Sequence, residues 1–218
     1  HNGRRRQRQM CIRDRSNAES REISPIEKSV GFVKLSNSRT TIIIDAAPPP
    51  MGKKAVKADA STLAFEMVSG QRRIFTSCGP GYLFGSNLSS ASRQTSSHSV
   101  VYIDNQNSSQ FSDKESWLKI PKKVIINGPR NVPKEISNDQ GICIFEGAHD
   151  GYVKSHGLTH VRKLKLAQDG QTFEGEDLII AIEDSHKRQF DKIAKKTSRG
   201  SLSVLSLIHI SEPTRQSL

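Results

Sequence analysis

Short runs of β-branched and apolar residues recur along the chain, and residues that favour turns separate them. In the first half, the runs 30–35 and 40–45 flank the cluster Ser36–Arg39, an arrangement typical of a hairpin. The segment 63–67 then alternates large apolar residues with smaller or polar ones, which is the period of a strand with one buried face. The pair Gly70-Gln71 reads as a tight turn that leads into a further strand.

The second half repeats this pattern after a polar and less regular stretch. We expect Gly79–Ser92 to be a loop rich in Gly and Ser, and 184–196 to be a loop or a short helix. Asp169-Gly170 is a hairpin turn signal. Many short strands joined by turns predict an all-β fold, an antiparallel β-sandwich. The remaining strand signals are 98–104, 124–126, 142–146, 158–166 and 172–182.

Both ends of the chain differ in character from the segment between them. Residues 5–15 match one reading frame of a transposase-type sequencing adapter, and residues 205–215 match the opposite strand of the same adapter, so the non-native ends are 1–15 and 205–218. We therefore expect both ends to be non-native, and residues 16–204 to be one truncated β-sandwich domain. The alternative is a basic arm at one end and a short apolar tail at the other.

Excluding these ends changes what the charge implies. The formal net charge is +11, and residues 1–15 hold six arginines and one aspartate. The balance of about +6 that remains favours anionic partners, without choosing between nucleic acid and acidic glycan. Because the Arg-rich end carried the nucleic-acid signal, we predict no nucleic-acid partner. No apolar run approaches the ~20 residues that cross a bilayer, so we also predict no membrane span.

Two blocks near the middle of the chain carry the most specific signal. Thr62–Gly79 and Arg93–Asp104 resemble paired segments of the heparinase II/III family of polysaccharide lyases. In that family a strand reading roughly Leu-Ser/Ala-Phe-Glu precedes an Arg, a Thr and a His, which come just before a strand ending in Asp. The corresponding residues here are Arg93, Thr95, His98 and Asp104. Further matches are Gly31–Leu35, Asp45–Pro50, His149–Tyr152 and Gly157–Arg162.

The resemblance implies a division of labour between two domains. Family members join an N-terminal α/α toroid to a C-terminal β-sandwich, and they cleave acidic polysaccharides by β-elimination at a uronate. The reaction needs a neutralised carboxylate, a base for the C5 proton and an acid for the leaving oxygen. Because the principal Tyr, His and Asn come largely from the toroid, we expect this chain to be a supporting domain, inactive without it. The alternative is a non-catalytic carbohydrate-binding or structural module.

The resemblance also implies a metal site and a cellular location. A zinc ion usually takes four N, S or O ligands, and His98 stands at a family ligand position. Asp59 and Ser61 stand where the family has histidines, and Cys78 stands near a family aspartate. The predicted Zn²⁺ ligands are therefore His98, Asp59 and Cys78, with a small buried Cys78 as the alternative. The family favours a bacterial protein that is periplasmic or secreted.

Four residues are candidates for binding the acidic polysaccharide. Arg93 is suited to bidentate pairing with a carboxylate, although a solvated position is the alternative. His98 is a candidate for the cleft, and a hydrogen-bonded histidine at a sheet edge is its alternative. His149 and Tyr152 lie in a turn-like His-Asp-Gly-Tyr segment that could face a sugar. The alternative is a structural turn with its glycine at positive φ and Tyr152 packed on the sheet.

Overall fold

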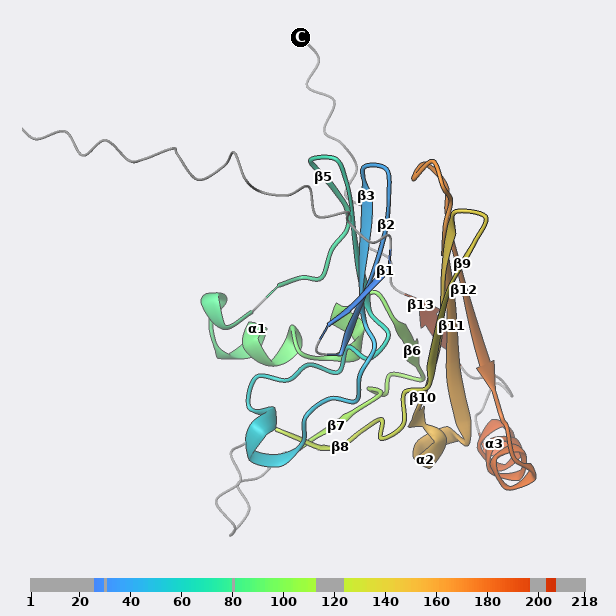
Figure 1. Ribbon diagram of the computed structural model, residues 1–218. Helices are drawn as coiled ribbons and strands as arrows, with labels where there is room; N and C mark the ends of the chain where they lie inside the picture. Colours follow the sequence, from blue (N-terminus) through green and yellow to red (C-terminus); the bar gives the residue numbers. More distant parts are fainter. Residues whose placement is uncertain (1–25, 30, 80, 113–123, 197–202, 207–218) are drawn as a thin grey trace, which may run out of the picture.

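The computed structural model describes residues 26–29, 31–79, 81–112, 124–196 and 203–206. Within them, two antiparallel sheets face each other, as Figure 1 shows. The first sheet has the order β1 (Ile26–Ser29), β2 (Phe32–Asn37), β3 (Thr40–Asp45), β4 (Phe65–Ser69) and β5 (Arg72–Phe75). The second has the order β12 (Phe173–Ile180), β11 (Leu158–Leu166), β10 (Ile142–Tyr152) and β9 (Lys134–Asp139).

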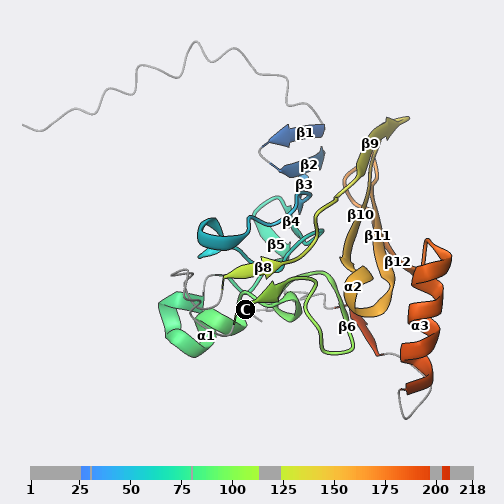
Figure 2. The ribbon, with the colours of Figure 1, turned by 90° about the horizontal axis from the view of Figure 1, so that it is seen from below.

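Smaller elements surround one end of this sandwich. The helix α1 lies beside the first sheet and α3 beside the second, in both Figure 1 and Figure 2. None of the helices among the described residues is long and apolar enough to span a bilayer. The paired short strands are β6 (Val101–Ile103) with β13 (Val204–Ser206), and β7 (Gln110–Phe111) with β8 (Ile125–Asn127). The helices are α1 (Ser86–Ala91), α2 (Val153–His156) and α3 (Asp184–Lys196), with 3-10 turns η1 (Gly52–Ala55), η2 (Gly81–Phe84) and η3 (Thr95–Ser97).

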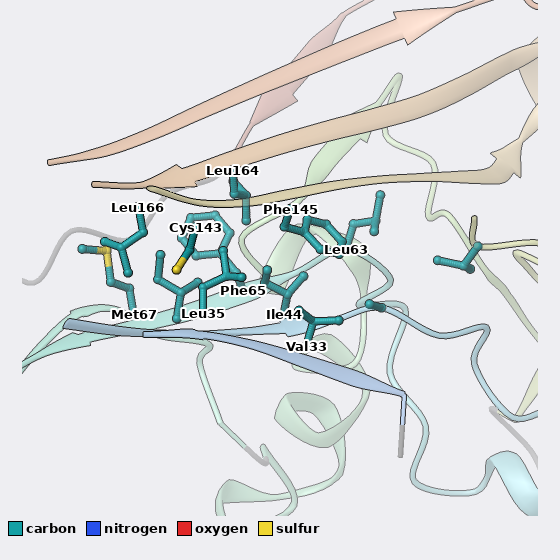
Figure 3. Packing of buried hydrophobic residues seen from close by; sticks show 13 residues of the cluster. Val33, Leu35, Ile44, Leu63, Phe65, Met67, Cys143, Phe145, Leu164 and Leu166 are labelled. Carbon is teal, nitrogen blue, oxygen red and sulfur yellow. The ribbon is translucent and has the colours of Figure 1, made fainter. Parts of the chain in front are cut away.

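One hydrophobic core fills the space between the two sheets (Figure 3). Successive side chains of a strand point to opposite faces, so Ile42 and Ile44 are fully buried while Ile43 between them is 48% exposed. Phe145 and Leu164 meet them from the second sheet. This alternation on two facing antiparallel sheets confirms the predicted all-β sandwich.

The first hairpin ties the two sheets together. Its strands β2 and β3 pair from Phe32↔Asp45 to Asn37↔Thr40, which confirms the turn predicted between them. The amide of Asn37 donates to three carbonyl oxygens of the opposite sheet, those of Gly141 (2.9 Å), Leu166 (3.2 Å) and Ala167 (3.0 Å). The turn residues therefore fix the relative position of the layers as well as the hairpin.

Several segments depart from the sequence pattern. The polar stretch 105–141 contains β8, which confirms the strand signal at 124–126, and also β7 and β9, which the sequence does not predict. An edge strand with solvated side chains, such as β9, lacks an apolar period. The predicted loop Gly79–Ser92 contains α1. The predicted turn at His149–Tyr152 is wrong, since β10 continues through it with an irregular register. Gly151 is needed for close packing and has no positive φ: a Cβ there would lie 2.6 Å from the Ser108 carbonyl oxygen.

The two ends that we predict to be non-native fall largely outside the described residues. This holds for residues 1–15 and 207–218. Leu205 and Ser206 are described, and they belong to β13, where they pair with Tyr102 and Val101 of β6. The non-native origin of both ends stays a prediction.

Candidate functional site

A pocket of about 440 Å³ opens on the outer face of the first sheet. The exposed side chains of Phe32 and Ile43 form its apolar part, because they lie on the strand faces that point away from the core. Its polar part consists of Asp45, Asp59, Ser61, Glu66, Ser77 and His98, of which the sequence predicts Asp59 and His98 as site residues. This is the place where a histidine, carboxyl groups and an open surface come together.

His98 is the most distinctive group in this pocket. It directly follows the 3-10 turn η3, and its side chain is only 6% exposed. Burial lowers its pKa to about 4, and the negative charge of Glu66 opposes this shift only in part. Among the described residues, no hydrogen-bond partner faces its Nε2 atom. The alternative prediction, a histidine satisfied by a hydrogen bond, therefore does not hold for its Nε2 atom. The ring is neutral at physiological pH, and its Nε2 has no partner among the described residues.

The carboxyl groups beside His98 are held by neighbours of this domain. Asp45 accepts a hydrogen bond from the Ser61 hydroxyl (2.7 Å), and Asp59 lies 3.6 Å from the guanidinium of Arg93. Burial raises the pKa of both aspartates, and the Ser61 bond and the Arg93 charge oppose it. Asp59 and Ser61, which stand where the resemblance expects histidines, are therefore paired with Arg93 and Asp45 of the same domain.

The predicted zinc ligands do not assemble around one point. No group of three or more His, Cys, Asp or Glu side chains is close enough to hold a metal in the part of the chain that the structure describes. Cys78 is exposed and so is not the small buried residue of the alternative. Its Sγ lies near the carbonyl oxygens of Gly79 (3.6 Å) and Ser92 (3.8 Å). Unpartnered His98 Nε2 fits a ligand role, but the donor set around it does not, and zinc binding stays a prediction.

Arg93 holds a neighbouring loop in place. Its guanidinium donates to the carbonyl oxygens of Ala58 (2.6 and 2.9 Å) and Ala55 (2.9 Å), and it stacks over the Phe111 ring at 5.1 Å. Burial lowers its pKa, and the nearby Asp59 raises it. Most of its donors are therefore engaged with the backbone, which leaves little for the bidentate substrate clamp that the sequence suggested.

His149 and Tyr152 are both buried, so neither presents its side chain at the surface where a sugar would bind. The Tyr152 hydroxyl donates to the Val101 carbonyl oxygen (2.8 Å), and burial raises the Tyr152 pKa well above its usual range. Tyr152 thus joins β10 to β6 inside a second apolar cluster with Ile103 and Leu158. Of the predicted structural turn, only the packing of Tyr152 is found, because the segment is a strand and Gly151 has no positive φ.

His149 belongs to a buried polar chain that the sequence did not reveal. The Gly151 amide donates to His149 Nδ1 (3.1 Å), so the neutral ring carries its proton on Nε2. That Nε2 is 3.2 Å from His160 Nδ1, and His160 Nε2 is 2.7 Å from Asp177 Oδ1. Each N–H thus donates to the next acceptor, from β10 through β11 to β12. Burial lowers the pKa of both histidines, and the Asp177 carboxylate opposes the shift.

Arg162 completes this chain. Its Nε (2.7 Å) and its Nη2 (2.8 Å) donate to the two carboxylate oxygens of Asp177. Its Nη1 donates to the carbonyl oxygens of Leu63 and Ser99. Burial alone would raise the pKa of Asp177, but the bonds from His160 and Arg162 bring it well below its usual range. Because Leu63 and Ser99 adjoin the His98 pocket in the chain, this network braces the pocket from behind.

The sequence carried only a weak signal for this network. His160 and Arg162 alternate on β11, and Asp177 pairs with Arg162 across the β11–β12 ladder. Charged residues at alternate positions of a strand normally indicate its solvent face. Only the pairing of three strands reveals that these side chains lie inside.

The comparisons agree with this architecture. Residues 22–213 match the family described as heparinase II/III-like, C-terminal. The FtsZ-localized protein C of Caulobacter vibrioides is 30% identical over 153 residues, which is 70% of this chain and 26% of that protein. A solved heparinase III with methylated lysines has a TM-score of 0.52 at 18% identity, over 71% of this chain and 21% of its own. The chain thus spans about a quarter of either relative, and it belongs to the heparinase II/III-like family, as a domain related to polysaccharide lyases.

Proposed function

We propose that this domain is the supporting β-sandwich of a protein that cleaves uronate-containing polysaccharide by β-elimination. The observation that carries the proposal is His98: a buried imidazole, neutral above a pKa of about 4, with an unpartnered Nε2 beside an open pocket. A neutral imidazole can exchange a proton with a substrate at physiological pH, whereas a charged one cannot accept it. Its role would be to hold or move a proton at the cleft.

The charge of the pocket supports a role shared with another domain. Its ionisable lining residues are Asp45, Asp59, Glu66 and His98, and none of these described groups is cationic at neutral pH. A uronate carboxylate would be repelled here unless another part of the protein supplied the counter-charge. The family's N-terminal toroid is the partner that we propose for that task. The exposed Phe32 and Ile43 give the pocket an apolar rim on which such a partner could pack.

The test uses the complete protein that the gene encodes. We expect it to release products with the ultraviolet absorbance of an unsaturated uronate from a polymer such as heparan or alginate. His98→Gln removes the imidazole at similar volume and should lower kcat by about 10²–10⁴-fold. Ser36→Ala, on the same sheet and outside the pocket, is the matched control. A folded complete protein that yields no unsaturated product from any uronate polymer would rule the proposal out.

A second candidate function is a non-catalytic carbohydrate-binding or structural module. The specific observation in its favour is that Asp59 and Ser61 are engaged with Arg93 and Asp45 at the positions where the resemblance expects histidines. The Caulobacter relative is named for its localisation with FtsZ and for no reaction. Binding of the polymer by the complete protein, without any unsaturated product, would favour this candidate.

A further inference from the structure

A second hollow, of about 600 Å³, lies at the end of the sandwich where the small elements gather. The segment between α1 and β6, the loop after β6, the β7–β8 pair and the end of β10 all contribute to it. It shares no lining residue with the His98 pocket. Its volume is within the ~300–1,000 Å³ of typical small-ligand sites.

The lining of this hollow is rich in side-chain amides, and we call it the amide groove. Its amides come from Gln94, Asn105, Gln106, Asn107, Gln110 and Asn127. The charged residues of its lining are Arg93 and Lys154, so no carboxylate of the described residues faces it. Amides both donate and accept hydrogen bonds, which suits a ligand covered with hydroxyl groups. Arg93 is already paired with Asp59, so the charge that suits a ligand carboxylate comes from the exposed Lys154.

The floor of the amide groove is held in place by a buried threonine. Thr95 Oγ1 accepts from the Ser108 amide (2.9 Å) and donates to the Ala60 carbonyl oxygen (3.0 Å), while the Thr95 amide donates to Asn107 Oδ1 (2.9 Å). The loop therefore keeps its shape before any ligand binds. Preorganisation of this kind lowers the entropic cost of binding.

A tight turn and two glycines shape the rest of the groove. Asp104 and Asn105 both have positive φ (51° and 60°), and the Gln106 amide donates to the Ile103 carbonyl oxygen (2.8 Å). This is the geometry of a type I′ turn, for which Asp and Asn are favoured. On the opposite wall, a Cβ at Gly128 would lie 2.6 Å from the Ser109 hydroxyl. The missing side chain lets the Ser109 side chain pack closely against the Gly128 backbone.

Ser109 supplies the clearest sign that the groove lacks a partner. Its side chain is 2% exposed, and its hydroxyl has no hydrogen-bond partner among the described residues. Buried hydroxyls are nearly always hydrogen-bonded, to protein, water or ligand. An unsatisfied hydroxyl in the wall of a polar groove is where a ligand hydroxyl, or a water that it orders, would bind.

We propose that the amide groove binds an acidic oligosaccharide, at a site separate from the His98 pocket. Lys154, which is exposed, would pair with a uronate carboxylate, and the amides and Ser109 would bind the sugar hydroxyls. The proposal does not rest on His98 or on any elimination reaction. A domain of this kind would hold a polysaccharide chain whether or not the complete protein cleaves it.

Titration calorimetry of the full chain with a defined uronate tetrasaccharide tests this site. An uncharged glucose tetrasaccharide serves as the comparison ligand. We expect the uronate tetrasaccharide to bind more tightly than the glucose tetrasaccharide, because its carboxylates are attracted to Lys154. Added salt should weaken the binding of the uronate, because it screens this attraction. Equal affinity for the two ligands, or no binding of the uronate, would overturn the proposal.

Three substitutions locate the binding. Lys154→Gln should weaken uronate binding about tenfold, the loss expected for one charge-assisted hydrogen bond. Gln110→Ala, on the exposed side of β7, should weaken it about threefold without touching the core. Lys187→Gln on α3 removes an equal charge outside the groove and should change nothing. Equal effects of Lys154→Gln and Lys187→Gln would overturn the site. His98→Gln should leave this binding intact, which separates it from the proposed lyase function.

Discussion

Replacing Asp177 by Asn should destabilise the sandwich strongly, although Asp177 lies on an edge strand. The substitution keeps the shape of the side chain and removes its charge. Asp177 accepts two hydrogen bonds from Arg162 and one from His160, at 2.7 to 2.8 Å. Arg162 is 2% exposed, so its guanidinium would lose its counter-charge inside the protein.

The magnitude follows from the burial of the two partners. Leaving one partner of a buried ion pair without the other costs about 3–5 kcal/mol. The Asp177 side chain is 22% exposed, and solvent screens part of this cost, so we expect about 3 kcal/mol. Against a total stability of ~5–15 kcal/mol, that loss is large enough to measure without ambiguity.

Urea unfolding followed by circular dichroism at neutral pH measures this loss. Glu176→Gln on the same strand removes an exposed charge and should change the free energy of unfolding by less than about 0.5 kcal/mol. The folded-state pKa of Asp177 is lowered, so its contribution is present above the unfolded value of ~3.9 and is lost as pH falls through the folded value. A loss for Asp177→Asn no larger than for Glu176→Gln would refute the role that we assign to this network.

Three further predictions concern stability, and each can be measured by equilibrium unfolding. The lowered His98 pKa, about 4 against 6.5 when unfolded, should cost the wild type about 3 kcal/mol as pH falls from about 6.5 to 4. His98→Gln should flatten that pH dependence, and an unchanged slope would contradict the burial argument. Phe145→Ala should cost about 3–5 kcal/mol by opening a cavity between the sheets, whereas Ile43→Ala on the outer face should cost less than about 1.5; similar losses would argue against the core in Figure 3. Gly157→Ala and Gly52→Ala both place alanine at positive φ, but only the first meets a neighbour, the His186 carbonyl oxygen, so it should cost at least about 1 kcal/mol more.

Local residue pattern and turn chemistry were enough to identify most of the sandwich. Alternation and turn residues predict the β2–β3 hairpin, the turn at Gly70 and the extent of β11, because these features depend on neighbours in the chain. The order of short motifs was also enough to indicate the heparinase II/III-like family. The edge strand β9 escaped prediction because a solvated strand has no apolar period to detect.

The roles of individual polar residues depended on tertiary structure. His149, His160 and Asp177 come from three strands, and only their pairing in the second sheet turns them into one buried hydrogen-bonded chain. Arg93 looked like a substrate clamp in the sequence, yet its donors are engaged by the backbone of a distant loop. A sequence pattern records which residues prefer water on average. Whether a particular imidazole or guanidinium is buried, partnered or open to a ligand depends on atoms that lie far away in the chain and are brought together only by folding.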